Sequence, residues 1–152
     1  MSVNLGTLID AAVSHALTTG RFEKVNGYEP KSAPGYGLTA AVWAQSVTTI
    51  QGSGLDSASS LVALNVRLFT SMLSEPQDAI DPNMIEAVNA LLGSYIGDFD
   101  LGVTGVRNVD VLGQNGVPLR AEAGYVNQDG KLLRVFTITL PIIVNDVWAE
   151  VA

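Results

Sequence analysis

The stretch that decides the fold is Gly124-Tyr125-Val126-Asn127-Gln128-Asp129-Gly130-Lys131-Leu132-Leu133-Arg134-Val135-Phe136-Thr137-Ile138-Thr139-Leu140. It predicts two long β-strands joined at Asp129-Gly130, because such a turn needs a positive φ that glycine adopts without steric cost. Only Thr137 and Thr139 interrupt the apolar core of the second strand. A strand of this kind is covered on both faces. In a chain this poor in catalytic residues, we expect one of the two covers to be another protein.

Two helices are predicted outside this hairpin. The first spans residues 4–19, where apolar side chains recur with helical spacing, and Gly20 follows its end. The second follows Asp81-Pro82, with Asp81 as N-cap and Pro82 in the first helical position. Its apolar face runs as far as Ile96, and Gly97 is the expected stop.

The other strands are expected at residues 39–50, 59–73 and 103–112. In the second of these, Val62 to Leu68 alternates apolar and other residues, as a half-buried strand does. Residues 20–39 are rich in Gly and Pro and predict an irregular connection, and residues 51–58 have the composition of a mobile tip. The order α-β-β-α-β-β-β predicts an α+β fold: a mainly antiparallel sheet of about five strands with two helices on one face.

The composition is that of one soluble domain. At 152 residues the chain has room for one hydrophobic core, so residues 1–152 are expected to form a single domain. Charged residues are only 15% of the chain, against roughly 25% in ordinary soluble domains. A subunit with large buried interfaces has such a composition, and so does a monomer rich in Ser, Thr, Asn and Gly.

The charge and the residue types present exclude several functions. A net charge of −7 with scattered basic residues argues against nucleic acid as the main ligand. The absence of cysteine excludes disulfides and thiolate chemistry. No window approaches the roughly 18 apolar residues of a membrane span, and no basic leader segment is present at the N-terminus. We therefore expect a soluble protein that is made inside the cell, without a membrane partner.

Motifs that carry chemistry are weak. His15 is the only histidine, and no carboxylate follows it at a spacing suited to a catalytic triad, so we expect a solvated or locally bonded side chain. Residues 35–40 match a phosphate-binding glycine pattern but lack the strand before and the helix after. Residues 98–100 start like a calcium loop, which then lacks its glycine and its closing glutamate. Trp43 and Trp148 are more typical of packed aromatics than of ligand platforms. No metal, cofactor or catalytic residue is predicted.

Residues 75–100 contain six acidic residues and no basic residue. The acids are Glu75, Asp78, Asp81, Glu86, Asp98 and Asp100. Those near the start of the second helix suit its positive end, but the two that follow its end do not. Two interpretations remain open. The segment is either a solvated loop or an acidic rim, with Glu75, Asp78, Asp98 and Asp100, that faces a basic partner or a channel through which DNA slides.

Several stretches resemble the tail terminator proteins of long, non-contractile-tailed bacteriophages, especially those that infect actinobacteria. The matching stretches are residues 20–31, 33–35, 38–43, 65–68, 72–83, 106–110, 123–131, 137–141 and 145–148. The most specific is Glu75-Pro76-Gln77-Asp78-Ala79-Ile80-Asp81-Pro82. Together the stretches span most of the chain in the expected order.

The resemblance implies a structural virion protein at the junction of tail and head. Such subunits form a ring, expected to be a hexamer, that caps the tail tube, stops tube polymerisation and offers a surface to the head-tail connector or stopper protein. DNA would only pass through the lumen, and the family needs no cofactor and catalyses nothing. A long arm of residues 39–73 is expected to dock onto the tube.

Seven residues are the candidates for the assembly interface: Gln51, Leu55, Asp56, Arg67, Leu133, Val135 and Thr137. The last three share one face of the final strand, whereas Phe136, Ile138 and Leu140 are expected to pack against the helices. Three other functions remain open. They are a head-tail adaptor or tail-completion subunit, a small metal-dependent hydrolase that uses the acidic stretch, and a small-molecule binding domain.

Overall fold

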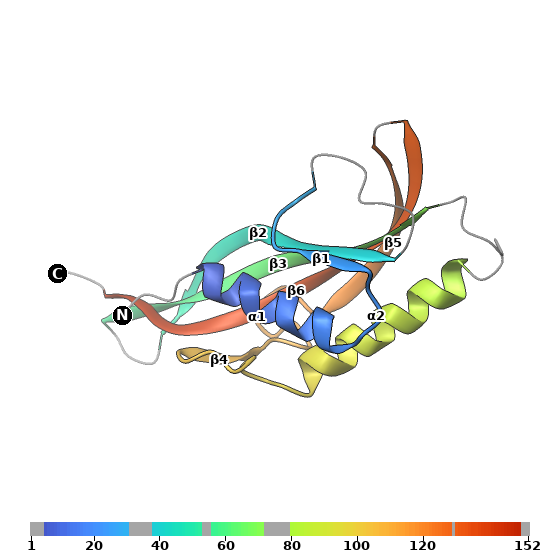
Figure 1. The fold of residues 1–152 in the computed structure, drawn as a ribbon. Coiled ribbons are helices and arrows are strands. Elements are labelled where there is room, and N and C mark those ends of the chain that lie inside the picture. The colour runs from blue at the N-terminus through green and yellow to red at the C-terminus, as the bar shows by residue number, and fades with distance from the viewer. Residues whose placement is uncertain (1–4, 31–37, 53–55, 72–79, 129, 150–152) are drawn as a thin grey trace.

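The computed structural model describes residues 5–30, 38–52, 56–71, 80–128 and 130–149. Two helices, α1 (Leu5–Thr18) and α2 (Ile80–Ile96), lie on one face of a six-stranded sheet, as Figure 1 shows. Gly20, with a φ of 69°, follows the end of α1, and Gly97 follows the end of α2. The predicted α+β class with both helices on one face is confirmed.

The sheet is built around its last strand. Its strands are β1 (Lys24–Asn26), β2 (Thr39–Gln51), β3 (Ser57–Ser71), β4 (Val106–Val109), β5 (Arg120–Gln128) and β6 (Lys131–Ala149). Their order is β1-β2-β3-β6-β4, and β5 pairs with β6 beside β4. All pairings are antiparallel except that of β1 with β2, so the sheet is mainly antiparallel as expected.

The strand β1 was not predicted, and the expected irregular connection over residues 20–39 is wrong at this point. Lys24 to Asn26 pair in parallel with Thr39 to Ala41, which adds a short edge to the sheet. Three residues are too few to show a strand period, and Gly27 and Pro30 follow them directly. The strand expected over residues 103–112 is likewise shorter, since only Val106–Val109 pairs with β6.

β6 is longer than the sequence predicts because it continues through Pro141. The strand pairs with β5 as far as Thr139 and with β4 from Ile142, so Pro141 lies where the outer partner changes. Its carbonyl accepts a 3.0 Å hydrogen bond from Asp110 N–H on the β4 side. The N and C=O of one strand residue point to the same side. The missing N–H of Pro141 therefore faces the gap between β5 and β4, where it leaves no ladder bond unmade.

The main core fills the space between the helices and the sheet. From β3 it takes Val62, Leu64, Val66 and Leu68, and from β6 it takes Ile138, Leu140, Ile142 and Val144. The helices contribute Leu8, Ala12, Ala16, Met84, Ala87, Val88, Leu91 and Tyr95. Phe136 packs against this core from its edge. The prediction that Phe136, Ile138 and Leu140 face the helices is confirmed.

Asp81 does not have the role that the sequence suggested. α2 begins at Ile80, and both carboxylate oxygens of Asp81 accept hydrogen bonds from Arg134 of β6, at 2.9 and 3.3 Å. The Arg134 guanidinium also lies 4.5 Å from the centre of the Tyr125 ring. The hydrogen bond that Arg134 donates to Asp81 raises the pKa of Arg134. Asp81 thus ties the first turn of α2 to the closing hairpin instead of capping the helix.

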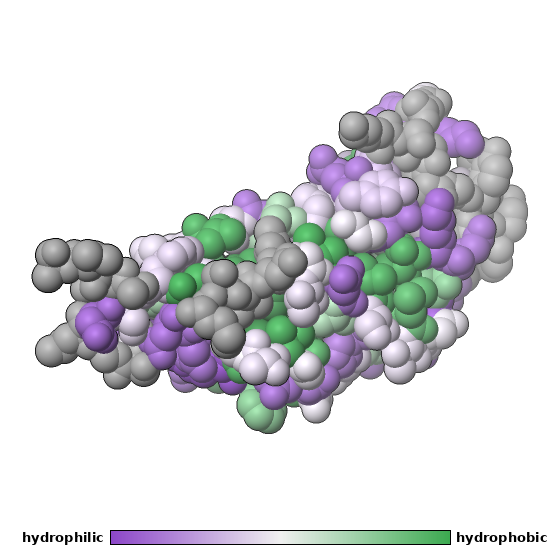
Figure 2. Space-filling model, turned by 60° about the vertical axis from the view of Figure 1, so that its left-hand side comes forward, coloured by the Kyte–Doolittle hydropathy of each residue, from purple (hydrophilic) through white to green (hydrophobic). Residues whose placement is uncertain are grey.

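One end of the sheet extends as an arm formed by β2, β3 and β6. Thr39 to Val42 of β2 are buried, but residues 44–49 and Gln51 are exposed. Near the tip of the arm, Ser59 Oγ accepts a hydrogen bond from Asp146 N–H at 2.9 Å. Figure 2 shows hydrophobic residues gathered over the middle of one face of the molecule, with polar residues toward both ends.

Candidate assembly surface

A second, smaller cluster lies on the sheet face that points away from the helices. It contains Ala41, Phe69, Leu133 and Val135, with Trp43 and Val126 packed against them. Leu133 and Val135 are predicted interface residues, and both are buried within the chain, with exposed fractions of 0% and 3%. Among the described residues, Trp43 of β2 and Val126 of β5 pack against this cluster, so strands of the same sheet contribute to its cover. Thr137, the third predicted residue of this strand face, is half-buried.

A groove of about 360 Å³ lies beside this cluster on the same face. Its wall includes Arg67, Thr137 and Glu122, which occupy one cross-strand row of β3, β6 and β5. Gly124 lies two residues after Glu122 on the same face of β5, opposite Val135. It has no side chain to fill the space. The curved backbone of the sheet therefore shapes the groove, and a few polar side chains line it.

Arg67 is held in a fixed position at this groove. Its Nε donates a 2.8 Å hydrogen bond to Thr137 Oγ1, and the guanidinium carbon lies 5.2 Å from the centre of the Trp43 ring. Such a contact between a cation and an aromatic ring adds about 0.5–1 kcal/mol at accessible sites. These contacts position the guanidinium without neutralising it. Among the described residues, no carboxylate pairs with Arg67.

The acid in the groove is already paired. Glu122 lies in the wall of the groove, and its carboxylate is 2.9 Å from Arg120 Nη2 on the same strand. Both side chains are more than half exposed, so this pair contributes little to stability. Its effect is to direct the negative charge of Glu122 toward Arg120. The groove consequently offers the positive charge of Arg67 to whatever enters it.

The predicted interface residues fall into two separate sets. Arg67, Val135 and Thr137 all line the groove, and Leu133 belongs to the adjoining cluster. Gln51 and Asp56 lie instead at the tip of the arm, and both are exposed. Leu55 lies outside the described residues. From Asp56 to Arg67 the chain advances by 11 residues along β3, which at about 3.3 Å per residue separates them by roughly 35 Å.

Two of the four acidic residues of the predicted rim have partners within the chain. Asp98 accepts a hydrogen bond from His15, and Asp100 Oδ1 accepts one from Gly102 N–H at 3.0 Å. These contacts explain why two acids follow the end of α2, where the helix dipole disfavours them. Glu75 and Asp78 lie outside the described residues. The rim itself thus remains a prediction.

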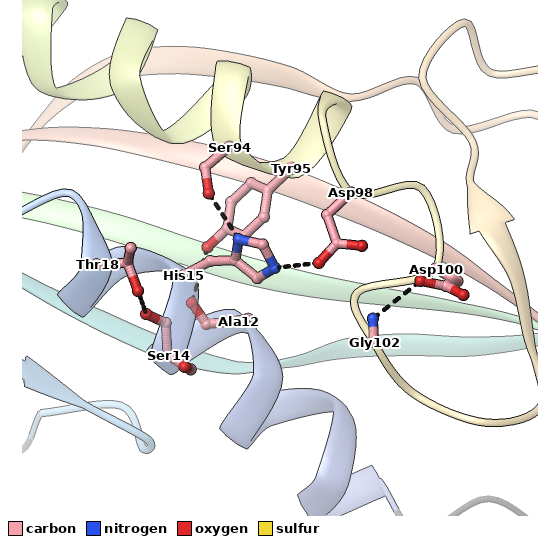
Figure 3. A network of polar contacts seen from close by, with 9 residues as sticks. All are labelled: Ala12, Ser14, His15, Thr18, Ser94, Tyr95, Asp98, Asp100 and Gly102. Atoms are coloured by element: carbon pink, nitrogen blue, oxygen red, sulfur yellow. Dashed lines mark hydrogen bonds and ion pairs between the residues drawn. The ribbon is translucent and has the colours of Figure 1, made fainter.

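His15 has partners that the sequence did not reveal (Figure 3). Its Nδ1 is 2.6 Å from Ser94 Oγ, and its Nε2 is 3.0 Å from Asp98 Oδ2. A neutral imidazole satisfies both contacts when it accepts from the serine and donates to the carboxylate. The expectation of a solvated or locally bonded His15 is therefore wrong, because both partners come from a distant part of the chain. The partners are far away in sequence, so their spacing gave no signal.

The three side chains have the composition of a catalytic triad but not its surroundings. Ser94 lies in the last turn of α2, where the helix presents carbonyl groups rather than free N–H groups. An oxyanion needs such N–H donors, so this end of a helix is poorly suited to acyl transfer. Tyr95, beneath the imidazole, donates a 3.1 Å hydrogen bond to the carbonyl of Ala12, and burial raises its pKa. The network links α1 to the end of α2.

Within the part of the chain that the structure describes, no group of three or more His, Asp or Glu side chains is placed to hold a metal ion. Its helices are too short or too polar for any of them to cross a membrane. Asp110 is buried, but its carboxylate accepts hydrogen bonds from the N–H groups of Gln114 and Asn115, which stabilises the turn after β4.

Comparison with known proteins identifies the fold. No protein-family model matches the sequence, and no curated protein matches it. Among solved structures, the chain is similar to one described as part of the virion of a native gene transfer agent particle. The TM-score is 0.54 at 12% sequence identity, and the match covers 91% of this chain and 95% of that chain. At this identity the likeness establishes a shared fold.

Proposed function

We propose that this chain is a structural virion protein that forms a ring on the end of a phage tail tube. The proposed ring, a hexamer, stops polymerisation of the tube protein and provides the surface that the head-side connector binds. This role needs no cofactor and no catalysis. It places the protein at the junction of tail and head, with genome DNA passing through the lumen past an acidic rim.

The observation that carries the proposal is the shared fold with a chain of a virion particle, over nearly the full length of both chains. The resemblance of the sequence to tail terminators points to the same class of protein independently of that match. The outer face adds a physical argument. It presents a groove with an arginine that lacks a carboxylate partner among the described residues, and this suits the binding of another protein better than an enzymatic reaction.

A head-tail adaptor or completion subunit is the alternative, because a fold shared with a chain of a virion particle fits either role. The two functions differ in the partner that the protein captures first. A terminator binds the end of the tube, whereas an adaptor binds the connector on the head side. Pull-down of this chain with each partner separately distinguishes them.

Electron microscopy of tubes tests the proposal. The tube protein is polymerised alone and with increasing amounts of this chain, and tube lengths are measured. We expect shorter tubes of limited length, with added density at one end only. Tubes of unlimited length at every ratio would contradict the proposed function.

A further inference from the structure

We propose that the arm tip of one copy docks into the outer groove of the next copy, where Asp56 pairs with Arg67. This inference rests on the proposed function, because it names the contact that would join neighbouring subunits in the ring. It assigns a partner of stated chemistry to the groove: a second copy of this chain that supplies a carboxylate. The contact surface consists of the exposed end of β2 with Asp56 on one copy and the groove on the other.

The groove side of the contact is prepared for a carboxylate. Thr137 and Trp43 hold the guanidinium of Arg67 through its Nε and its flat face. Its two terminal nitrogens are the donors that bind a carboxylate in a paired, planar arrangement. Arg67 is half-buried, and the attraction between opposite charges is stronger where less water surrounds them. Arg21, Arg120 and Arg134 each have a carboxylate partner, whereas Arg67 and Arg107 have none among the described residues. Arg107 bonds instead to Asn145 and Ser59.

The tip side offers a carboxylate that is free to enter the groove. Asp56 is exposed directly before β3, and no ion pair joins it to another described residue. The exposed run of β2 from residue 44 to residue 49 lies beside it on the arm. Figure 1 shows this end of β2 and β3 at the opposite end of the sheet from the β5–β6 turn. The tip therefore projects where another molecule can receive it.

Within one chain the two sides cannot meet, because Asp56 and Arg67 belong to the same extended strand region, roughly 35 Å apart. The contact must join two copies through different surfaces. Contacts of this head-to-tail kind generate closed rings when the rotation between copies closes. Copies that each carry a net charge of −7 repel one another, so a specific pair of opposite charges also selects the register of the contact.

Disulfide trapping tests this contact while both charged residues stay in place. The chain contains no cysteine, so cysteines can be introduced one at each side, as Gln51→Cys at the tip and Asn65→Cys in the groove. Asn65 pairs with Trp43, eight residues from Gln51 along β2, which is about 26 Å. A disulfide within one chain requires Cα atoms less than about 7 Å apart. Any link between positions 51 and 65 therefore joins two copies.

The double variant is oxidised in free solution at millimolar concentration and, separately, on tube ends. We expect a ladder of linked chains on a non-reducing gel, with the 51–65 link identified by peptide mass spectrometry. The matched control carries Gln51→Cys with Leu17→Cys on α1, since Leu17 is exposed on the helix side. Equal linkage in the control, or no 51–65 link in either condition, would overturn the inference.

Charge exchange tests the pairing itself in the cysteine background. We expect Asp56→Arg or Arg67→Asp to reduce the yield of the link at least about tenfold, and the two changes together to restore most of it. The neutral variant Arg67→Gln replaces Arg67→Asp if the latter does not fold. A yield that no single charge change alters would show that the pair does not form.

The outcomes separate this inference from the proposed function. If the chain caps tubes but no 51–65 link forms, the docking contact is wrong and the terminator function stands. If the link forms but tubes grow without limit, the contact stands and the terminator function is wrong.

Discussion

The two faces of the sheet are built from the same strands but are covered in different ways. On the inner face, two helices cover a continuous core in which Leu64, Ile138 and Leu140 are fully buried. On the outer face, the curl of the sheet covers only a small cluster around Phe69 and Leu133 and leaves a polar groove beside it. The inner face is thus complete in one chain, whereas the outer face has room for a partner. The outer face is therefore the candidate surface for assembly.

The largest effect is expected from opening the inner core. Leu140→Ala removes a fully buried side chain between β6 and the helices. We expect a loss of about 3 kcal/mol in the free energy of unfolding, because the cavity cannot collapse between rigid elements. Urea denaturation followed by circular dichroism measures it. A loss below about 1 kcal/mol would mean that the helices do not hold this face as described.

A somewhat smaller loss is expected from the outer cluster. Leu133→Ala should cost about 2 kcal/mol in the isolated chain, because Leu133 is buried there against Phe69 and its neighbours. The same urea titration, carried out at concentrations where the chain is monomeric, provides the value. If the loss appears only in assembled protein, a neighbouring subunit and not this chain provides the cover.

The link between the helices should contribute less. His15→Ala removes two hydrogen bonds, to Ser94 and to Asp98, and we expect a cost of about 1–2 kcal/mol in unfolding free energy. Because the network lies on the helix side, assembly should not change. Ser94→Ala, which removes one of the two bonds, is the matched variant and should cost about half as much. If folded His15→Ala protein no longer assembled, the helix side of the molecule would also take part in assembly.

The smallest effect on stability is expected in the groove. Arg67→Gln removes the charge and should cost only about 0.5 kcal/mol, since one hydrogen bond and one ring contact are lost near the surface. Assembly should nevertheless fail. Arg21→Gln removes the same charge from the helix side, where Arg21 is only 3.7 Å from Glu86 in an exposed pair, and should leave assembly intact. If both variants assembled equally well, the claim that assembly uses the outer face and not the helix side would be wrong.

The sequence predicted the elements with strong local signals. The alternation from Val62 to Leu68 has the period of a strand, and Asp129-Gly130 marked the turn of the closing hairpin. Contacts between distant residues had no such signal. His15 lies 79 and 83 residues from its partners, and Arg134 lies 53 residues from Asp81. The alternation of apolar and polar residues predicts which face of a strand a residue occupies, but not how far apart two residues lie. The sequence therefore did not show that the predicted interface residues form two sets, one at the arm tip and one at the groove.

Tube length measured with three proteins side by side tests the account most directly. The tube protein is polymerised with the unmodified chain, with His15→Ala and with Arg67→Gln, each at the same excess over tube ends. The account predicts tubes of limited length with the first two proteins and longer, unlimited tubes with Arg67→Gln. Limited tubes with all three proteins, or unlimited tubes with all three, would contradict the claim that this chain assembles on tube ends through its outer face.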